Sequence, residues 1–557
     1  MRTGIRLLAF LTLSMALHCP VLAQDGGDSF EDDPFAAQQG SMPRRQNRGG
    51  AQWRPSTYND QNAVIQAMLG SQIKRNLKYR FESVGVLSDG LHSPSWFTSN
   101  RQGLASVKTK SAYARYGMFG EMRLPSAFGM KYGMDLGLGY GLHDDWFVQQ
   151  LYIDVDYRAW SLSVGMKERW AGLSNPELGS GSLTWSGNST PIPQARLGLP
   201  EYTRLGILGN WFSVKGHVAY GMYTDGKYRS SVPDGVYTDG IFYHSKEAYI
   251  RFGDRERFPL ELTLGLQMHA QFGGVKHNRE KDADGNLVEE YRLPGGLKSA
   301  WNILLPFNKP GEQTSENGNT LGSWLLGLDW HLPQMTIRLY YDHFYEDHSS
   351  LLGIEYKSDE TGYKHFVNYG FRRNWLDGLY GLEFIMPDEW PVRDVVIEVL
   401  NTRGLCGAVY NPKGSDYIQG VDGRDNMYNH IDVYDSYSHY GFSIGSPMLI
   451  SPVYNGNGMN SFASNRVNMF HMGLEGGVGR HLDYQVKLTA ARHWGTYEYP
   501  FDRTRDVTSA MVRLMWLAGD NASCRIGVSY GIDRDDSAWL GNNRGVMLSV
   551  IKTWKVL

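Results

Sequence analysis

Hydrophobic and polar residues alternate along most of the chain from about Tyr79 onward. The segment 151–157 alternates, the segment 160–166 alternates again, and only two residues separate them. A period of two places successive side chains on opposite faces of a strand, and two such strands joined by two residues form a hairpin. Further segments with this period are 212–222, 261–272, 336–344, 484–492, 511–517, 525–530 and 546–554. The pattern therefore predicts an antiparallel, all-β structure.

Among all-β structures, the hydropathy and the aromatic content of the chain favour a membrane-embedded barrel. After the N-terminal region no apolar stretch reaches the roughly 20 residues that a transmembrane helix needs. Only a closed barrel holds half-polar strands in a bilayer while every backbone group is paired. Tryptophans near strand ends are typical of the aromatic girdles of such barrels: Trp146, Trp160, Trp211, Trp494, Trp516 and Trp554. We expect a large antiparallel transmembrane β-barrel of about 16–20 strands.

Soluble β-sandwiches and propellers also alternate and are also rich in glycine, which supplies 65 of the 557 residues here. A sandwich of this length would be oversized for one domain. A propeller would show an internal repeat of about 40–50 residues, and the sequence has none. Both alternatives are therefore less favoured than the barrel.

The N-terminus has the three parts of a signal peptide. Arg2 and Arg6 form a positive region, residues 7–17 are apolar, and Val21-Leu-Ala23 fits a small-residue cleavage site. We expect residues 1–23 to be removed near Ala23 and Gln24, with the mature protein in the outer membrane. We expect residues 24–75 to form a disordered periplasmic arm, in which a short helix after Asp60 is an option. We expect residues 76–557 to form the barrel.

Charge and cysteine content exclude several classes of function. The 55 basic and 58 acidic residues leave no basic excess, so we expect no nucleic-acid partner. Cleavage of the signal peptide leaves Cys406 and Cys524, which either pair or stay as thiols. Neither cysteine has the spacing of a zinc site. We expect no metal and no cofactor.

Two segments carry groups that are common in metal or catalytic sites. Segment 341–348 contains two histidines and three carboxylates, but alternation directs His343 and His348 to opposite faces, so a polar lumen lining is favoured over a metal site. Segment 282–286 resembles part of a calcium loop, but Tyr291 stands where a glutamate ligand is required. No nucleophile elbow, phosphate loop or zinc-protease motif is present. We predict no enzyme and no catalytic residues.

The segment from Arg403 to Tyr454 is long and rich in glycine, aspartate and tyrosine. Its tyrosines are Tyr410, Tyr417, Tyr428, Tyr434, Tyr437, Tyr440 and Tyr454. Aromatic faces pack against sugar rings, while nearby polar side chains bond the hydroxyl groups and arginine pairs with uronic acids. The alternative is that the tyrosines pack the loop into the barrel mouth.

Six short motifs in order resemble the capsule assembly Wzi family of outer-membrane proteins. They are His92-Ser-Pro-Ser-Trp-Phe-Thr-Ser-Asn-Arg-Gln-Gly103, Tyr345-Glu-Asp-His-Ser349, Asp377-Gly-Leu-Tyr-Gly381, Glu398-Val-Leu-Asn-Thr-Arg-Gly404, Asp425-Asn-Met-Tyr-Asn-His430 and Ile444-Gly-Ser-Pro-Met448. Ser95 intrudes into the first motif, and Cys406 departs from the family's Ser-Gly turn after the fourth. The resemblance spans most of the mature chain.

The resemblance implies a barrel of about 18 strands with an occluded lumen. It also implies a non-enzymatic lectin that holds capsular or exopolysaccharide at the cell surface, embedded in outer-membrane lipid, and we expect a monomer. The polysaccharide-binding candidates are Asp425, Tyr428, Asn429 and His430, with Arg424 and Tyr434 as a second tier. A competing role for the Asn-His pair is to fold this loop into the barrel by hydrogen bonds. A porin for small solutes is the alternative function, and an enzyme acting on lipid or glycan is a third.

Overall fold

The computed structural model describes residues 74–555, with gaps at 125–126, 207–210, 282–286, 305–317, 347–353, 359–363, 369–375, 406–425, 431–432 and 520–521. The signal peptide, nearly all of the N-terminal arm, the calcium-like segment, His348 and Cys406 therefore lie outside the described residues. None of the helices in the described part is long and apolar enough to span a membrane.

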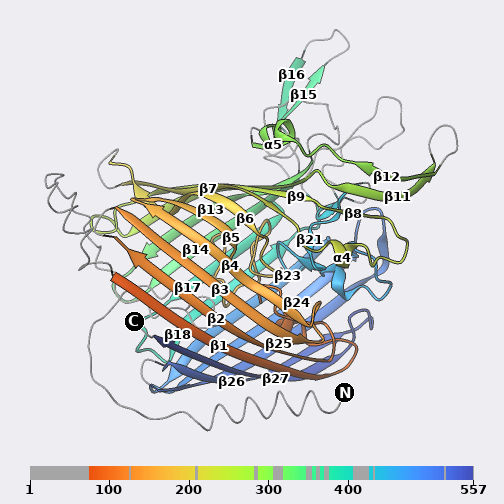
Figure 1. Ribbon diagram of the computed structural model, residues 1–557. Coiled ribbons are helices and arrows are strands. Elements are labelled where there is room, and N and C mark those ends of the chain that lie inside the picture. Colours follow the sequence, from red (N-terminus) through yellow and green to blue (C-terminus); the bar gives the residue numbers. More distant parts are fainter. Residues whose placement is uncertain are drawn as a thin grey trace.

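Eighteen antiparallel strands form one closed barrel, which confirms the predicted fold (Figure 1). Consecutive barrel strands pair with each other, and β1 also pairs with β27 to close the sheet. The predicted hairpin at 151–166 is confirmed, with Tyr157 opposite Trp160. The strands are β1 (Lys74–Asp89), β2 (Lys110–Arg123), β3 (Phe128–Tyr140), β4 (Trp146–Tyr157), β5 (Trp160–Met166), β6 (Gln194–Arg204), β7 (Phe212–Met222), β9 (Phe242–Phe252), β10 (Leu260–Phe272), β13 (Asn319–His331), β14 (Thr336–Glu346), β17 (Gly378–Ile385), β18 (Val392–Asn401), β23 (Val467–Val478), β24 (Leu482–Gly495), β25 (Pro500–Ala518), β26 (Cys524–Asp535) and β27 (Asn543–Lys555).

Shorter elements lie in the connections between barrel strands. The strands are β8 (Tyr237–Asp239), β11 (Val275–Lys281), β12 (Leu287–Arg292), β15 (Ile354–Ser358), β16 (Lys364–Asn368), β19 (Asn429–His430), β20 (Asp435–Ser436), β21 (Ser438–His439) and β22 (Phe442–Ser443). The helices are α3 (Ser95–Thr98), α4 (Gly226–Arg229), α5 (Leu297–Leu304) and the 3₁₀ turn η3 (Pro452–Tyr454).

The outward face of the wall is an apolar band between two aromatic belts. On β4, Leu151, Ile153 and Val155 are exposed, whereas the alternate residues Tyr152 and Asp154 are buried inside. Aromatic residues at the short-turn end are exposed: Phe128, Tyr157, Trp160, Phe252, Trp330, Trp516 and Trp554. Tyr140 and Trp146 are exposed at the opposite end of β3 and β4. This band is the surface expected to meet lipid.

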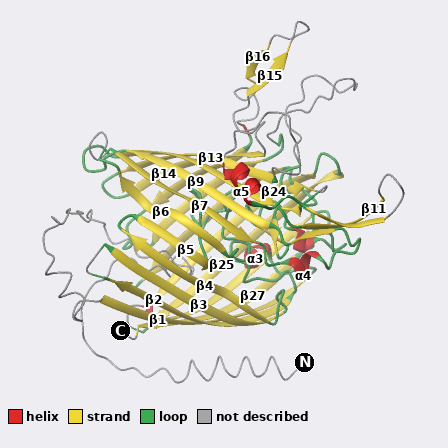
Figure 2. Ribbon diagram, turned by 45° about the horizontal axis from the view of Figure 1, so that its top comes forward, coloured by secondary structure: helices red, strands yellow, loops and turns green. Residues whose placement is uncertain are grey.

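The two ends of the barrel differ in the length of their connections. Tight turns join the strands at one end, and the long connections 167–193, 273–318 and 402–466 leave the other end. Figure 2 shows hairpins projecting beyond the barrel on the long-loop side. Outer-membrane barrels have short periplasmic turns and longer extracellular loops, so we expect the long-loop end to face outside the cell.

Three connections of the long-loop end meet inside the barrel: 90–109, 167–193 and 402–466. Gln102, after α3, donates its backbone N–H to the carbonyl of Gly187 (2.6 Å), and Asn100 donates its own to the side chain of Asn188 (3.0 Å). The connection 167–193 in turn bonds the tyrosine-rich segment, where Ser186 N–H donates to the carbonyl of Ile444 (2.9 Å). Residues of all three connections share one hydrophobic core with inward wall residues.

A buried charge network holds these interior segments to the wall. Arg115 on β2 donates to Glu82 (2.7 Å), to Asp135 (3.0 Å) and to Glu168 of the connection 167–193 (2.6 Å). Arg80 also pairs with Asp135. All five side chains are buried.

Candidate functional site

Tyr428, the central residue of the predicted site, packs the loop instead of facing outward. Its side chain is 0% exposed, and its ring lies against Phe344 of β14 and against Phe462. The hydroxyl donates to the carbonyl of Leu183 and accepts the backbone N–H of Ser446 (3.1 Å). Burial raises the pKa of the Tyr428 hydroxyl, so the group stays a protonated donor. These contacts favour the packing role at this position.

Asn429 also bonds within the loop. Its side chain donates to the carbonyl of Phe462 (2.9 Å) and to the side chain of Asn426 (3.1 Å), and it accepts the backbone N–H of Phe462 (2.8 Å). Tyr434 is buried, and its ring lies 5.5 Å from the half-buried ring of His430. Arg424 and Asp425 lie outside the described residues, so a sugar contact of the predicted set stays a prediction.

The loop before β9 supports the tyrosine-rich segment from the side. Arg229 of α4 is fully buried and donates to Asp225 (2.9 Å) and to the carbonyls of Tyr434 (3.2 Å) and Ser438 (2.8 Å). The carboxylates of Asp225 and Asp435 hold the pKa of Arg229 above its usual value. A charge fixed in this way stabilises one position of the loop.

Next to this loop the outer rim carries arginines stacked on aromatic rings. The Arg403 guanidinium lies 4.9 Å from the centre of the Trp494 ring, and that of Arg466 lies 4.0 Å from the centre of the Tyr497 ring. The Tyr497 hydroxyl donates to the carbonyl of Arg403 (3.2 Å), which joins the two pairs. We call Arg403, Arg466, Trp494 and Tyr497 the rim cluster. Arg403 is exposed and the other three are half-buried.

The predicted segment is directly connected to the rim cluster. Asn426 donates to the carboxylate of Glu498 (3.0 Å), one residue after Tyr497. Asn465 donates to Asn426 (2.9 Å) and to the carbonyl of Met427 (3.0 Å), one residue before Arg466. The adjacent Tyr499 is strongly exposed. The half-buried Asn426 and the buried Asn465 therefore help to position the aromatic and basic surface of the rim.

The rim cluster continues along the next strand. Arg505 of β25 lies 3.8 Å from the centre of the Phe501 ring and 5.1 Å from that of Trp539. Stacked guanidinium groups keep their edges available for a carboxylate, while ring faces pack against the apolar face of a sugar. The surface therefore has the chemistry to bind an acidic glycan.

Sequence reasoning missed the rim cluster. Trp494 was assigned to an aromatic girdle, and Arg403 was only the boundary of the tyrosine-rich segment. The available signal was the run Tyr497-Glu-Tyr499 immediately after a predicted strand, where a loop exposes its side chains.

Two neighbouring polar residues of β14 have structural partners. The Ser182 hydroxyl of the interior connection donates to Asp342 (2.5 Å), and His343 bonds the carbonyl of Asp377 (2.8 Å). His348 lies outside the described residues, so the expectation that His343 and His348 face opposite sides stays a prediction.

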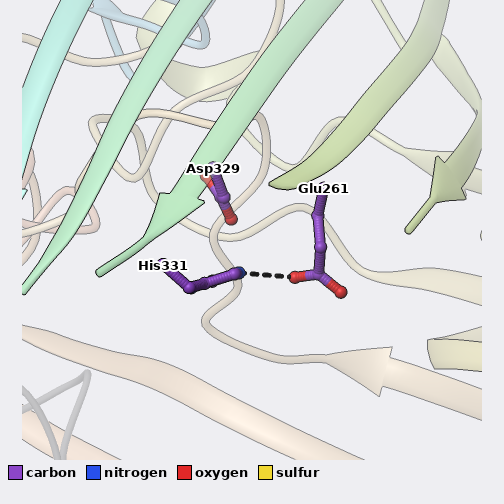
Figure 3. A group of neighbouring side chains, drawn as sticks. All are labelled: Glu261, Asp329 and His331. Atoms are coloured by element: carbon purple, nitrogen blue, oxygen red, sulfur yellow. Dashed lines mark hydrogen bonds and ion pairs between the residues drawn. The ribbon is translucent and has the colours of Figure 1, made fainter. Parts of the chain in front are cut away.

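Glu261, Asp329 and His331 gather at the short-turn end (Figure 3), the group of described residues spaced closely enough for a metal. His331 bonds Glu261 (2.9 Å), and Arg338 donates to both oxygens of Asp329 (2.7 and 3.1 Å). The guanidinium occupies the ligand oxygens of Asp329, so the group is an ion-pair network.

No protein-family model and no curated protein sequence matches the chain. Among solved structures, Wzi of Escherichia coli, described as a carbohydrate-binding β-barrel involved in group 1 capsule assembly, matches with a TM-score of 0.50 and 13% identity, over 85% of this chain and 83% of its own. OccK5 of Pseudomonas aeruginosa matches with a TM-score of 0.42 and 9% identity, over 87% of this chain and 99% of its own. OpdQ of the same organism matches with a TM-score of 0.43 and 10% identity, over 87% of this chain and 100% of its own. The chain has the fold of outer-membrane β-barrels.

Proposed function

We propose that the protein is a non-enzymatic lectin that holds an acidic capsular or exopolysaccharide at the cell surface. The observation that carries the proposal is the rim cluster at the long-loop end, where an exposed arginine and a half-buried one stack on half-buried aromatic rings. A neutral sugar needs only ring faces and hydroxyl partners, whereas paired guanidinium groups favour a polymer with carboxylates. The barrel fold shared with the carbohydrate-binding protein Wzi agrees with this function.

Contacts between the connections support a lectin over a diffusion channel. Three connections bond one another inside the barrel, and the cavity beside the charge network has a volume of about 90 Å³. A channel for solutes needs a continuous water-filled path through the lumen, from one end of the barrel to the other. The proposal therefore includes a closed lumen.

Replacing both rim arginines tests the binding surface. We expect Arg403→Ala with Arg466→Ala to weaken binding of the acidic exopolysaccharide purified from the producing strain by about ten- to a hundredfold, or about 1.4–2.8 kcal/mol. Isothermal titration at two salt concentrations measures the effect, because salt screens the exposed charges. The matched control is Arg544→Ala, an exposed rim arginine paired with Asp89 and not stacked on a ring in the described structure. Equal affinity in the double variant and the control would contradict the proposal.

Deletion of the gene tests the function in cells. We expect polymer synthesis to continue while most of the polymer moves from the cell fraction to the medium, because its attachment is lost. Quantifying uronic acid in both fractions measures this redistribution. The wild-type gene should restore retention and the double arginine variant should not. Polymer that stays on cells of the deletion strain would count against an anchoring role.

A further inference from the structure

Helix α5 lies near the rim at the long-loop end of the barrel (Figures 1 and 2), where it contacts residues of β7, β9 and β10. The Tyr220 hydroxyl donates to the carbonyl of Ala300 (2.8 Å), and the Lys246 ammonium donates to the carbonyls of Ile303 and Leu304 (2.7 Å each). Ile303 packs with Ala270 and Phe272 of β10.

The strand register shows that these wall residues face outward. Lys246 lies opposite Val218 on β7 and Met268 on β10, and Val218 is an exposed residue of the apolar band. The next residue, Glu247, faces the interior, where its carboxylate lies near His217. Successive strand residues point to opposite faces, so Lys246 belongs to the lipid side.

The helix covers a polar stretch of that lipid side. His244, two residues before Lys246, is 1% exposed, and its ring lies 4.5 Å from the ring of Tyr220. A lysine exposed on the lipid face of a barrel is destabilising, by up to about 2–4 kcal/mol at mid-membrane depth. Here the Lys246 ammonium instead donates hydrogen bonds to carbonyls at the C-terminus of α5. The C-terminus of a helix has unpaired carbonyl acceptors and carries the negative end of the helix dipole.

The opposite side of α5 presents two large apolar residues. Leu297 is 92% exposed and Trp301, one helical turn later, is 63% exposed. The lipid-facing band lies on the same strands that α5 contacts. Val218 lies opposite Lys246, whereas Ile250 and Leu264 lie farther from the long-loop end, and all three apolar residues are exposed. The apolar face of the helix is therefore on the same side of the wall as the surface that meets lipid.

We propose that α5 is an interfacial membrane anchor whose Leu297 and Trp301 insert into the outer leaflet. Tryptophan concentrates at membrane interfaces, and an amphipathic helix with an apolar face lies in that plane. The anchor fixes the connection 273–318 to the membrane surface, and it stands independently of glycan binding.

Spin labelling of the full chain in lipid vesicles tests this anchor. Cys19→Ser, Cys406→Ser and Cys524→Ser remove the three cysteines of the full chain and give the background, and Trp301→Cys carries the nitroxide. Leu264→Cys is the lipid reference and Lys227→Cys, at an exposed position of α4, is the aqueous reference. We expect the ratio of oxygen to nickel-chelate accessibility at position 301 to match position 264 and to exceed position 227 several-fold.

A second variant, Leu297→Cys, gives the same readout if the tryptophan replacement does not fold. Aqueous accessibility at positions 297 and 301, equal to that at position 227, would overturn the proposal. Dipolar broadening between labels at position 301 would also overturn it, because the face would then contact a second copy of the chain.

Discussion

Arg115→Leu should lower the free energy of unfolding of the barrel by about 3–5 kcal/mol, the usual effect of removing one partner of a buried ion pair. Arg115 is buried among Glu82, Asp135 and Glu168. Without it these carboxylates lose their shared cation in a site from which water is largely excluded. Guanidinium unfolding in detergent micelles, followed by tryptophan fluorescence and by heat-modifiable migration on gels, measures the loss.

A second substitution distinguishes charge imbalance from lost packing. Arg115→Leu combined with Glu168→Gln should recover part of the stability, because one uncompensated carboxylate is removed. Arg544→Ala, at an exposed pair, should change stability by at most about 1 kcal/mol. If Arg115→Leu resembles Arg544→Ala, the network is solvated and the interior segments are held by other contacts.

Tyr428→Ala should release the tyrosine-rich segment from the interior and open the barrel to ions. Removing a buried aromatic side chain costs about 3–5 kcal/mol, and this ring contacts both the wall and the loop. Planar-bilayer recording should show no steady conductance for the wild type and fluctuating currents for Tyr428→Ala.

Tyr428→Phe is the matched control for the ring. It keeps the packing and loses only the hydroxyl bonds to Leu183 and Ser446, at about 0.5–1.5 kcal/mol each, so the lumen should stay closed. Steady, large conductance of the wild type would contradict the closed lumen and support the porin alternative. A silent Tyr428→Ala would show that Tyr428 is not the main attachment of the loop.

Strand positions could be predicted because the alternation that defines them is local. Each wall residue faces either lipid or the interior. Leu151 faces lipid and its neighbour Tyr152 faces the interior, so a few consecutive residues are enough to show the alternation. The turn at Arg158 is local too. Arg158 has a left-handed φ of 55°, and only two residues join the two strands.

Loop positions could not be predicted because their contacts join distant parts of the sequence. Tyr428 bonds a residue 245 positions away, and the Tyr497 hydroxyl bonds one 94 positions away. Composition indicated an aromatic loop but left packing and glycan contact open. Likewise, His244 and Lys246 interrupt the apolar alternation of β9, and only the position of α5 explains why charge is tolerated there.

The pairing of β1 with β27 has a consequence for how the protein is made. Asp89 and Arg544, which form an ion pair at the outer end of this seam, are 455 residues apart in sequence. Until β27 has been synthesised, β1 has an unpaired edge, and an unpaired edge recruits foreign strands. Contacts of such long sequence separation also form slowly. Translocated chains therefore pass through an aggregation-prone open-sheet stage, and survival of that stage in the periplasm depends on shielding by a chaperone or by the assembly machinery.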